Sequence, residues 1–461
     1  MPLVGCWKEV AIMNKKEIDI LHGNMEKNIF LLALPIGIAS CLQILFNAVD
    51  AIMVGRFVGV NALAAVSGNA GLTGIFTNVI MGLAVGVNVV VAKKVVTAKK
   101  SEIKHLIQSL LMIGFCLGLG LAVFAEVLAP LLHHLLQTPE GIQREAVIYF
   151  RIYALSFPFL AIYNFAAAIF RSAGESKKPM LCVAMSGVIN VGLNTLFLLV
   201  FHLGVSGVAI ATGIANVINA IVILCMLYIS KTEVQLELGE WKWEKDGIRA
   251  VFQAGIPSAL QMALFPLSQS FIQQGINQFG EEAMSAFSIA HSVDGISYNF
   301  IVAFSQAVVT FLSQNHAAHN IERCRKAFRI GVLEAFGLSL VLCLIFYAFR
   351  YPLIHMYTSN KLVEKYALIR FRYIGILEEI VTFTEVPSGG LKGLGSSIKP
   401  AVISIIGYVG LRIIWALLVF PRWSTFLQLN LVFPFSWAVT GGIMLIVYCK
   451  HEKKMILKEE F

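Results

Sequence analysis

A single acidic residue inside the first apolar run of the chain could carry out ion chemistry. Asp50, in CLQILFNAVDAIMVG, is the only acid between residues 29 and 54. A carboxylate in apolar surroundings is costly to ionise, so it can alternate between a protonated and a cation-bound form. The alternative is an aspartate close to the end of its helix, whose side chain reaches the polar surroundings there or caps the next turn.

Two asparagines in a later apolar run offer oxygen atoms for the same chemistry. Asn190 and Asn194, in SGVINVGLNTLF, are four residues apart, which places both amides on one face of a helix. They could bind Na⁺ or hydrogen-bond Asp50, although asparagines in membranes also join helices to each other. An internal repeat, described below, favours a site, because it pairs the three polar positions with the apolar Ile272, Leu411 and Trp415.

The second half of the chain has ionisable residues of its own. Asp294 lies three residues after His291 on one helix face, and Glu378 and Glu385 share a face seven residues apart. These residues could attract cationic substrates or form a second coupling site. An alternative is equally open. Arg370 and Arg372 of the same run could form ion pairs with Glu378 and Glu379, and these acids would then have no functional role.

Other ionisable residues favour structural roles. We interpret Glu126 and Glu334 as single acids that are satisfied locally or lie at the membrane interface. We expect Arg412 to form a structural pair with another residue. His316 and His319 have metal-like spacing, but their loop is basic and has no nearby carboxylate. We therefore expect no metal site.

These side chains must be positioned by helices in a membrane. The chain has 461 residues, 57% hydrophobic and 14% charged, with a mean hydropathy of +0.77. Soluble proteins are about 45–50% apolar and 25% charged, so a cytosolic enzyme, a disordered chain and a secreted disulfide scaffold are excluded. A crossing needs about 20 apolar residues with a helical backbone. We predict an all-α polytopic membrane protein with twelve transmembrane helices, near residues 29–54, 61–92, 105–130, 146–170, 179–201, 207–229, 250–275, 283–312, 330–349, 365–390, 400–420 and 429–449.

The basic residues predict the orientation of these helices. Of the 36 Lys and Arg, 26 fall in the two tails and in the loops after even-numbered spans, and nine fall on the opposite side. Cytoplasmic loops carry the excess of Lys and Arg, so both termini are expected to be cytoplasmic. This bias accounts for the net charge of +9, and we expect no nucleic-acid partner.

The chain contains an internal repeat. A shift of 222 residues aligns Pro35 with Pro257, and a shift of 221 aligns RSAGESKKP with KGLGSSIKP. Six helices per half give a parallel repeat, which is typical of alternating-access transporters. The predicted organisation is a cytoplasmic N-tail (1–28), a first lobe (29–230), a cytoplasmic linker (231–249), a second lobe (250–449) and a cytoplasmic C-tail (450–461).

The sequence lacks the motifs of common catalytic centres. It contains no HExxH, no GxSxG nucleophile elbow and no GxxxxGK[ST] phosphate loop. We therefore expect a protein that is not an enzyme and needs no cofactor. Without an ATP motif, transport would be driven by an ion gradient or would run downhill.

Several of these segments resemble one transporter family. LALPIGIASCLQILFNAVDAIMVGRFVGVNALAAVS resembles the first two helices of the multidrug and toxic compound extrusion (MATE) family. The turns FRSAGESKKP and LKGLGSSIKP resemble its paired loops after helices four and ten. The resemblance covers about residues 24–450 and is closest to the bacterial branch with DNA-damage-inducible F-type and MepA-like proteins. It implies the two-lobed MATE-like fold in a bacterial plasma (inner) membrane.

The resemblance also assigns residues to the coupling site. The first-helix acid of the family falls on Asp50, its fifth-helix pair on Asn190 and Asn194, and its sixth-helix threonine on Thr212 of GVAIATGIA. The pair is often Asn-x-x-x-Asp, so asparagine at 194 removes a possible charge and leaves H⁺ or Na⁺ open as the coupling ion. A second cation site seen in another branch is not expected, because its acids would fall near Phe265 and Val381.

The resemblance implies a secondary active multidrug efflux antiporter. It would export cationic or amphipathic small molecules in exchange for H⁺ or Na⁺ by alternating access, as a monomer among membrane lipids. The alternative is a flippase or exporter of the same superfamily for lipid-linked precursors or metabolites. Such a flippase would be expected to have about fourteen helices and a cation-rich cavity, and neither is apparent in the sequence.

Overall fold

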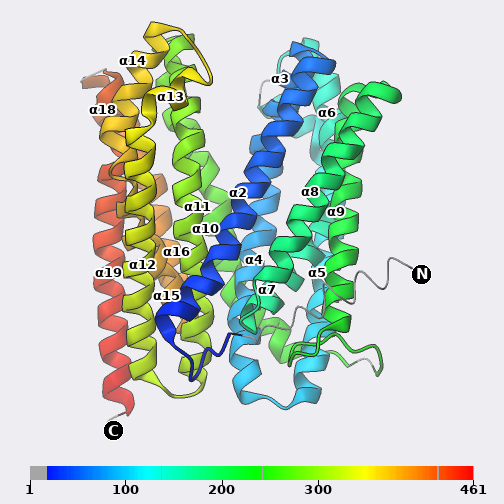
Figure 1. Cartoon of the computed structure of the whole chain (residues 1–461), viewed down its shortest axis with the longest axis vertical. Coiled ribbons are helices and arrows are strands. Elements are labelled where there is room, and N and C mark those ends of the chain that lie inside the picture. Colours follow the sequence, from blue (N-terminus) through cyan, green and yellow to red (C-terminus); the bar gives the residue numbers. More distant parts are fainter. Residues whose placement is uncertain (1–17, 137, 241, 423–424, 460–461) are drawn as a thin grey trace. The chain divides into compact units, whose positions relative to one another are not determined.

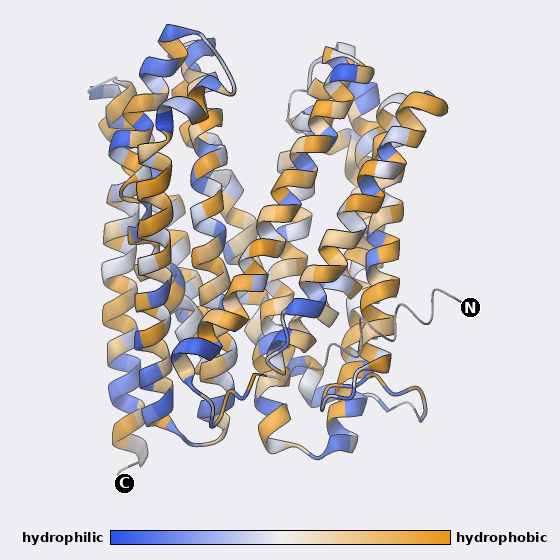
Figure 2. Ribbon diagram, viewed as in Figure 1, coloured by the Kyte–Doolittle hydropathy of each residue, from blue (hydrophilic) through white to orange (hydrophobic). Residues whose placement is uncertain are grey.

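The chain folds into apolar helices. The computed structural model describes residues 18–136, 138–240, 242–422 and 425–459, and every regular element in these ranges is helical. Ten of the described helices are long and apolar enough to cross a membrane, or eleven when the bent pair α6 (Glu140–Ala154) and α7 (Phe157–Ser172) counts as one span. In α19 (Val432–Glu459) the middle is hydrophobic and the C-terminal end hydrophilic (Figure 2). The predicted all-α polytopic membrane fold is confirmed.

The described helices form two compact units, of which the first comprises residues 38–259 with residues 18–19. Its centre is α7, which packs against α4, α5 and α9, and α8 lies beside α9 (Figure 1). A 47° bend separates α6 from α7, because Pro158 has no N–H to continue the helix. The elements of this unit are the later part of α2 (Met25–Phe57), α3 (Val60–Gly68), α4 (Ala70–Thr97), α5 (Lys100–Leu135), α6, α7, α8 (Lys177–Thr195), η1 (Leu196–Val200), α9 (Gly204–Ile229) and the start of α10 (Lys245–Asn277).

The second unit comprises residues 20–37 and 260–461. Its core forms around α11, which packs against α12 and α15, and α15 packs in turn against α19 (Figure 1). Its described elements are the start of α2, the rest of α10, α11 (Glu281–Ala317), α12 (Ile321–Ala348), α13 (Arg350–His355), α14 (Lys361–Arg370), η2 (Phe371–Gly375), η3 (Glu378–Val381), α15 (Thr382–Gly393), α16 (Ile398–Ser404), η4 (Ile405–Gly410), α17 (Leu411–Ile414), η5 (Trp415–Val419), η6 (Phe420–Arg422), α18 (Phe426–Asn430) and α19.

Helix α2 contributes to both units, which divide it after Gly37. The segment directly before it is held within the second unit, where the Arg323 guanidinium donates to the Ile20 and Gly23 carbonyls at 3.2 and 3.1 Å. Phe30 also packs on Phe304 there, with ring centroids 6.1 Å apart. The same helix therefore begins in the second unit and carries its later residues into the first.

Helix α10 also contributes to both units, because its first turns pack closely on α4. A Cβ added at Gly82 would lie 2.3 Å from the Ala259 Cα, and one at Gly86 would lie 2.5 Å from the Val251 carbonyl oxygen. Glycines four residues apart allow such close approach between membrane helices. The division between the two compact units consequently falls after Ala259, inside a helix.

The two repeat-related turns have the same backbone geometry. Gly174 and Gly395 have φ of 81° and 89°, a left-handed conformation that glycine adopts without strain. After Gly174, the N–H of Glu175 donates to the Phe170 carbonyl, and the N–H of Ser396 donates to the Leu391 carbonyl at the equivalent turn. These bonds end α7 and α15 in the same way. The matched residues RSAGESKKP and KGLGSSIKP are therefore explained by helix termination.

The predicted span 365–390 is not one continuous helix. It is divided into α14, the π-helical turn η2, the 3₁₀ turn η3 and α15. Residues 405–419 are likewise interrupted by the π-helical turns η4 and η5. Such irregular turns leave backbone groups without their regular helical partners. In the first of these segments the interruption lies beside buried charges, including Arg370, Glu378 and Glu379.

Candidate functional site

Three helices of the first unit bring the predicted coupling residues together. Asp50 lies near the C-terminal end of α2, Asn190 and Asn194 lie on α8, and Thr212 lies on α9. The four-residue spacing on α8 places both amides on the same side, and both asparagines are buried. The π-helical turn η1 begins directly after Thr195, so α8 loses its regular geometry one residue beyond Asn194.

Asn194 bonds directly to the Asp50 carboxylate. Its Nδ2 donates to Asp50 Oδ1 at 2.6 Å and also lies 3.2 Å from Asn190 Oδ1. A bond from an amide to a carboxylate is charge-assisted and stronger than one between neutral groups. The Thr212 hydroxyl donates to the Val208 carbonyl of its own helix at 3.0 Å and extends the cluster to α9.

The Asn190 amide can take two orientations in this cluster. With its nitrogen towards Thr212, Nδ2 lies 3.3 Å from Thr212 Oγ1, and its oxygen faces Asp50. With the amide turned over, the nitrogen donates to Asp50 Oδ1 at 2.8 Å and to Oδ2 at 3.3 Å. The second orientation suits an ionised Asp50, which can only accept hydrogen bonds. The first suits an Asp50 that carries a proton or shares a cation with the amide oxygen.

Two tyrosines of α6, which the sequence interpretation missed, lie near this cluster. Tyr149 and Tyr153 are within electrostatic range of the Asp50 carboxylate. Their rings stack, with centroids 6.1 Å apart and planes at 20°. The signal was present in the sequence, because two tyrosines four residues apart in VIYFRIYA share a helix face.

The cluster has the groups needed to hold a proton or a small hard cation. Its oxygen atoms come from one carboxylate, two amides and one hydroxyl, which suit Na⁺ better than a transition metal. Asn194 Oδ1 is buried and has no hydrogen-bond partner among the described residues. Within the same residues, no group of three His, Cys, Asp or Glu side chains is arranged to hold a metal ion.

In the second unit, Asp294 forms a buried ion pair with Arg370. The Nε and Nη2 atoms of Arg370 both lie 3.0 Å from Asp294 Oδ2, and both residues are buried. Arg370 Nη1 donates to Asn430 Oδ1 at 2.9 Å, and the guanidinium lies 4.3 Å from the Phe287 ring centroid. These contacts use Asp294 to neutralise Arg370, whereas the sequence had left open a pairing of Arg370 with Glu378 or Glu379.

The remaining predicted residues of the second unit surround this ion pair without joining it. The His291 ring stacks on Phe287, with centroids 5.7 Å apart. Glu378 and Glu379 are buried in η3, and the Oε2 atom of each has no hydrogen-bond partner in the described part of the chain. Glu385 lies one turn further along, in α15. The structure therefore brings together the four N-terminal residues but distributes the C-terminal candidates over several contacts.

Arg412 does not have the acidic partner that the sequence suggested. Its side chain is fully buried, and no carboxylate among the described residues lies within 4.0 Å of it. Its nearest polar groups are instead two serine hydroxyls, Ser268 Oγ at 3.2 Å and Ser436 Oγ at 3.4 Å. The pairing with an acid that the sequence suggested for Arg412 is therefore not found among the described residues, where Asp294 pairs with Arg370 instead.

A family profile matches both halves of the chain. The MatE profile covers residues 35–196 and again residues 257–418, which together make more than half of the sequence. The two matches begin 222 residues apart, the same offset as the internal repeat. The first match includes Asp50, Asn190 and Asn194.

Individual relatives are similar over most of their length. "Probable multidrug resistance protein YoeA" of Bacillus subtilis (strain 168) is 25% identical over 399 residues, which cover 84% of this chain and 85% of the relative. "Multidrug export protein MepA" of Staphylococcus aureus (strain N315) is 21% identical over 348 residues, or 73% and 74% of the two chains.

Solved structures share the fold. A MOP superfamily transporter from Pyrococcus furiosus Vc1 superposes with a TM-score of 0.87 at 19% identity, covering 96% of this chain and 99% of its own. An outward-facing MATE family transporter of the same superfamily superposes with a TM-score of 0.86, with the same identity and coverage.

Proposed function

The chain belongs to the MATE family of membrane transporters, as its motifs predict, and from this premise we propose that it is a secondary active exporter. It exchanges cationic or amphipathic small molecules for H⁺ or Na⁺ across the cell membrane. Relatives in this family are transporters and not enzymes, so the task of the site is binding and release. Two relatives have multidrug names, which supports a broad range of substrates.

The contact between Asp50 and Asn194 is the observation that carries this proposal. It joins α2 to α8 through a 2.6 Å bond to a carboxylate. A proton on Asp50 would convert an acceptor into a donor, and a cation would draw the amide oxygens towards it. In either case the hydrogen bonds that connect the two helices must change. Ion binding is thereby coupled to helix position, which is what antiport requires.

Inward ion movement supplies enough energy for export. Each elementary charge that moves down the membrane potential yields about 2.3 kcal/mol per 100 mV. Exchange of one ion for a monovalent cation moves no net charge and is driven by the ion's concentration gradient alone, whereas two ions per substrate move one net charge inward and also use the membrane potential. We propose that exchange of the ion held by Asp50 and its partners sets the direction of transport.

Efflux from proteoliposomes tests this function. Ethidium export by the wild type is measured with an imposed pH gradient and with an imposed Na⁺ gradient, in separate experiments, and again for Asp50→Asn. We expect export that depends on one of the gradients, and loss of that dependence in the variant, because asparagine cannot release or accept a proton. The gradient that drives export names the coupling ion.

Two controls make the result decisive. Size-exclusion chromatography and thermal unfolding show whether Asp50→Asn is folded, and Glu126→Gln provides a matched change of charge. Glu126 forms a partly exposed ion pair with Arg151 at 3.3 Å, on the same unit, and should transport normally when neutralised. Gradient-driven export by folded Asp50→Asn at the wild-type rate would refute the role of Asp50.

A further inference from the structure

Arg412 is a buried cation without a counter-charge in its own surroundings. Its exposed fraction is 0%, and its Nη2 atom has no hydrogen-bond partner among the described residues. Buried charges are normally paired, because an isolated guanidinium in a low-dielectric interior is strongly destabilising. Arg412 is thus a fully buried hydrogen-bond donor that forms no ion pair with any acid among the described residues.

The two hydroxyl groups near Arg412 do not supply negative charge. Ser268 Oγ donates to the Phe265 carbonyl at 2.8 Å, and Ser436 Oγ donates to the Phe433 carbonyl at 2.9 Å. Each hydroxyl hydrogen is therefore used, and the serines act towards Arg412 only as neutral acceptors. They orient the Nε and Nη1 sides of the guanidinium and leave the Nη2 side for another group.

Aromatic rings enclose the guanidinium, and one of them is shared with a second arginine. The Arg412 guanidinium carbon lies 4.8 Å from the Phe433 centroid and 5.1 Å from that of Tyr408. Arg370 lies 4.9 Å from the same Phe433 ring. Among the described residues, Arg370 forms an ion pair with Asp294 and Arg412 forms none. Arg412 is therefore the arginine beside this ring that has no paired carboxylate.

The internal repeat gives Arg412 no charged counterpart in the first unit. The offset of 221 aligns Asn190 with Leu411 and Thr212 with Phe433, whereas Arg412 falls on the apolar Val191. The charge is thus present in one half of the chain alone, which favours a ligand site over a structural position shared by both halves.

The backbone around Arg412 is suited to rearrangement. Arg412 lies in α17, a single turn of α-helix between the π-helical turns η4 and η5. Each π-helical turn contains an additional residue, and such turns occur frequently at functional sites. A shift of either turn along the helix would rotate Arg412 relative to Tyr408 and Phe433. This gives a closed site a route to open during a transport cycle.

We propose that Arg412 binds the oxyanion group of an amphipathic aromatic substrate, with Phe433 and Tyr408 packing against its ring. The unpaired Nη2 supplies a donor in the planar geometry that suits carboxylate and sulfonate groups. Substrates of this site therefore carry an acidic group next to an aromatic ring. The inference rests on the proposed function, because it takes the ligand to be an exported compound.

A matched pair of ligands tests the site without any ion gradient. Binding of naphthalene-2-sulfonate and of naphthalene-2-sulfonamide to the full-length protein is measured by calorimetry in phosphatidylcholine nanodiscs. The two probes have the same ring and differ in charge. We expect the wild type to bind the sulfonate at least tenfold more tightly, and Arg412→Gln to reduce this preference to about twofold or less.

Two further variants keep the test decisive. Arg422→Gln removes an exposed arginine that donates to the Leu418 carbonyl, and it should retain the wild-type preference. Arg412→Lys keeps the charge but cannot reach both serines and the ligand with a planar guanidinium, and it should weaken sulfonate binding at least threefold even if Arg412→Gln does not fold. Equal binding of both probes by the wild type would overturn the proposal, as would a preference that survives in Arg412→Gln or is unchanged in Arg412→Lys. Failure of the antiport hypothesis would appear separately, as normal ethidium export by Asp50→Asn.

Discussion

At the scale of single residues, Asn194 is the amide on which the Asp50 cluster depends most. Its Nδ2 makes the 2.6 Å bond to Asp50 and the 3.2 Å contact with Asn190. Removing one partner of a buried, charge-assisted hydrogen bond costs about 1.5–3 kcal/mol, and 1.4 kcal/mol corresponds to about tenfold in an equilibrium constant. We therefore predict that Asn194→Ala slows gradient-driven ethidium export about tenfold or more in proteoliposomes.

Asn164→Ala is the control for that variant. Asn164 is an asparagine of the same unit whose side chain donates to the Leu160 carbonyl of its own helix at 2.8 Å. Its removal should leave the export rate within about twofold of the wild type, because this bond lies within one helix and does not involve the Asp50 cluster. Equal rates for Asn194→Ala and Asn164→Ala would contradict a special role for Asn194.

Asp294 illustrates how a candidate site residue can prove to be a stabilising one. Asp294→Asn would leave the buried Arg370 charge unpaired, and we predict a loss of about 3–5 kcal/mol in unfolding free energy. The double variant Asp294→Asn/Arg370→Met should regain most of that loss in unfolding free energy, because no buried charge is then left unpaired. Thermal unfolding in detergent measures both effects. A stable Asp294→Asn protein that has lost transport would instead assign Asp294 to ligand binding.

At the scale of helices, close packing of α4 on α10 depends on glycine. A Cβ at Gly86 would lie 2.5 Å from the Val251 carbonyl oxygen and 2.8 Å from the Gly255 nitrogen, both backbone atoms that cannot rotate away. We predict that Gly86→Ala destabilises the first unit by about 1–3 kcal/mol through overpacking. Gly120→Ala is the control, since a Cβ at Gly120 meets nothing within 4 Å. In nanodiscs, the melting temperature of Gly86→Ala should fall below that of the wild type, and the melting temperature of Gly120→Ala should match it.

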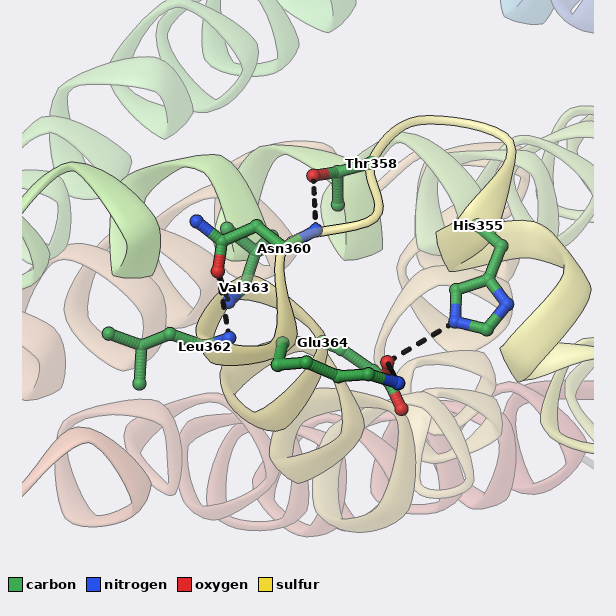
Figure 3. Close-up of polar contacts among 7 residues, drawn as sticks. His355, Thr358, Asn360, Leu362, Val363 and Glu364 are labelled. Carbon is green, nitrogen blue, oxygen red and sulfur yellow. Dashed lines mark hydrogen bonds and ion pairs between the residues drawn. The ribbon is translucent and has the colours of Figure 1, made fainter.

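The turn between α13 and α14 is the element with a pH-dependent contact (Figure 3). His355 Nε2 and Lys361 Nζ lie 3.2 and 3.1 Å from Glu364 Oε2, and Asn360 Oδ1 accepts from the N–H of Leu362 at 2.8 Å. The hydrogen bonds from His355 and Lys361 hold the pKa of Glu364 below its ordinary value. Glu364 therefore stabilises this turn above its unfolded-state pKa of about 4.3, and the stabilisation is lost as pH falls through the lower folded-state value.

Hydrogen exchange can measure this loss. We predict that at neutral pH the backbone amides of residues 361–370 exchange more slowly than in Glu364→Gln, and that this difference disappears as the pH falls below about 4, because protonated Glu364 is neutral like glutamine. Comparison at equal pH removes the intrinsic pH dependence of exchange. If the difference between the two proteins does not change with pH, the ion pairs of Glu364 do not stabilise the turn.

Apolar runs and repeats made most of the helices predictable, but they did not show where the helices break. Pro35, Pro257 and the paired glycine turns are local signals that do not depend on tertiary contacts. The interruption between Arg370 and Thr382 depends on which buried charges meet, and the spacing of Glu378 and Arg370 left their pairing open. Asp294 pairs with Arg370 from 76 residues away, a contact that no local pattern encodes.

At the scale of the whole molecule, orientation in the membrane determines which compartment supplies the coupling ion. Asp50 is seven residues from the last residue of α2, Phe57, or roughly 10 Å at 1.5 Å per residue. With 26 basic residues on the side of the tails and nine on the other, α2 should run from the cytoplasm to the outside. Asp50 would then lie close to the external source of H⁺ or Na⁺, as an exporter driven by inward ion flow requires.

Cysteine labelling on intact cells tests this orientation. In a variant without the eight native cysteines, a single cysteine is placed at Tyr357, in the exposed turn before α14, or at Glu240, in the exposed polar linker before α10. We predict that a membrane-impermeant maleimide labels Tyr357→Cys on intact cells and Glu240→Cys only after permeabilisation, because the excess of Lys and Arg retains the linker in the cytoplasm. The reverse pattern would place Asp50 near the cytoplasmic surface. The ion would then have to cross most of the membrane to reach Asp50 from outside, which would contradict the orientation predicted from the basic residues.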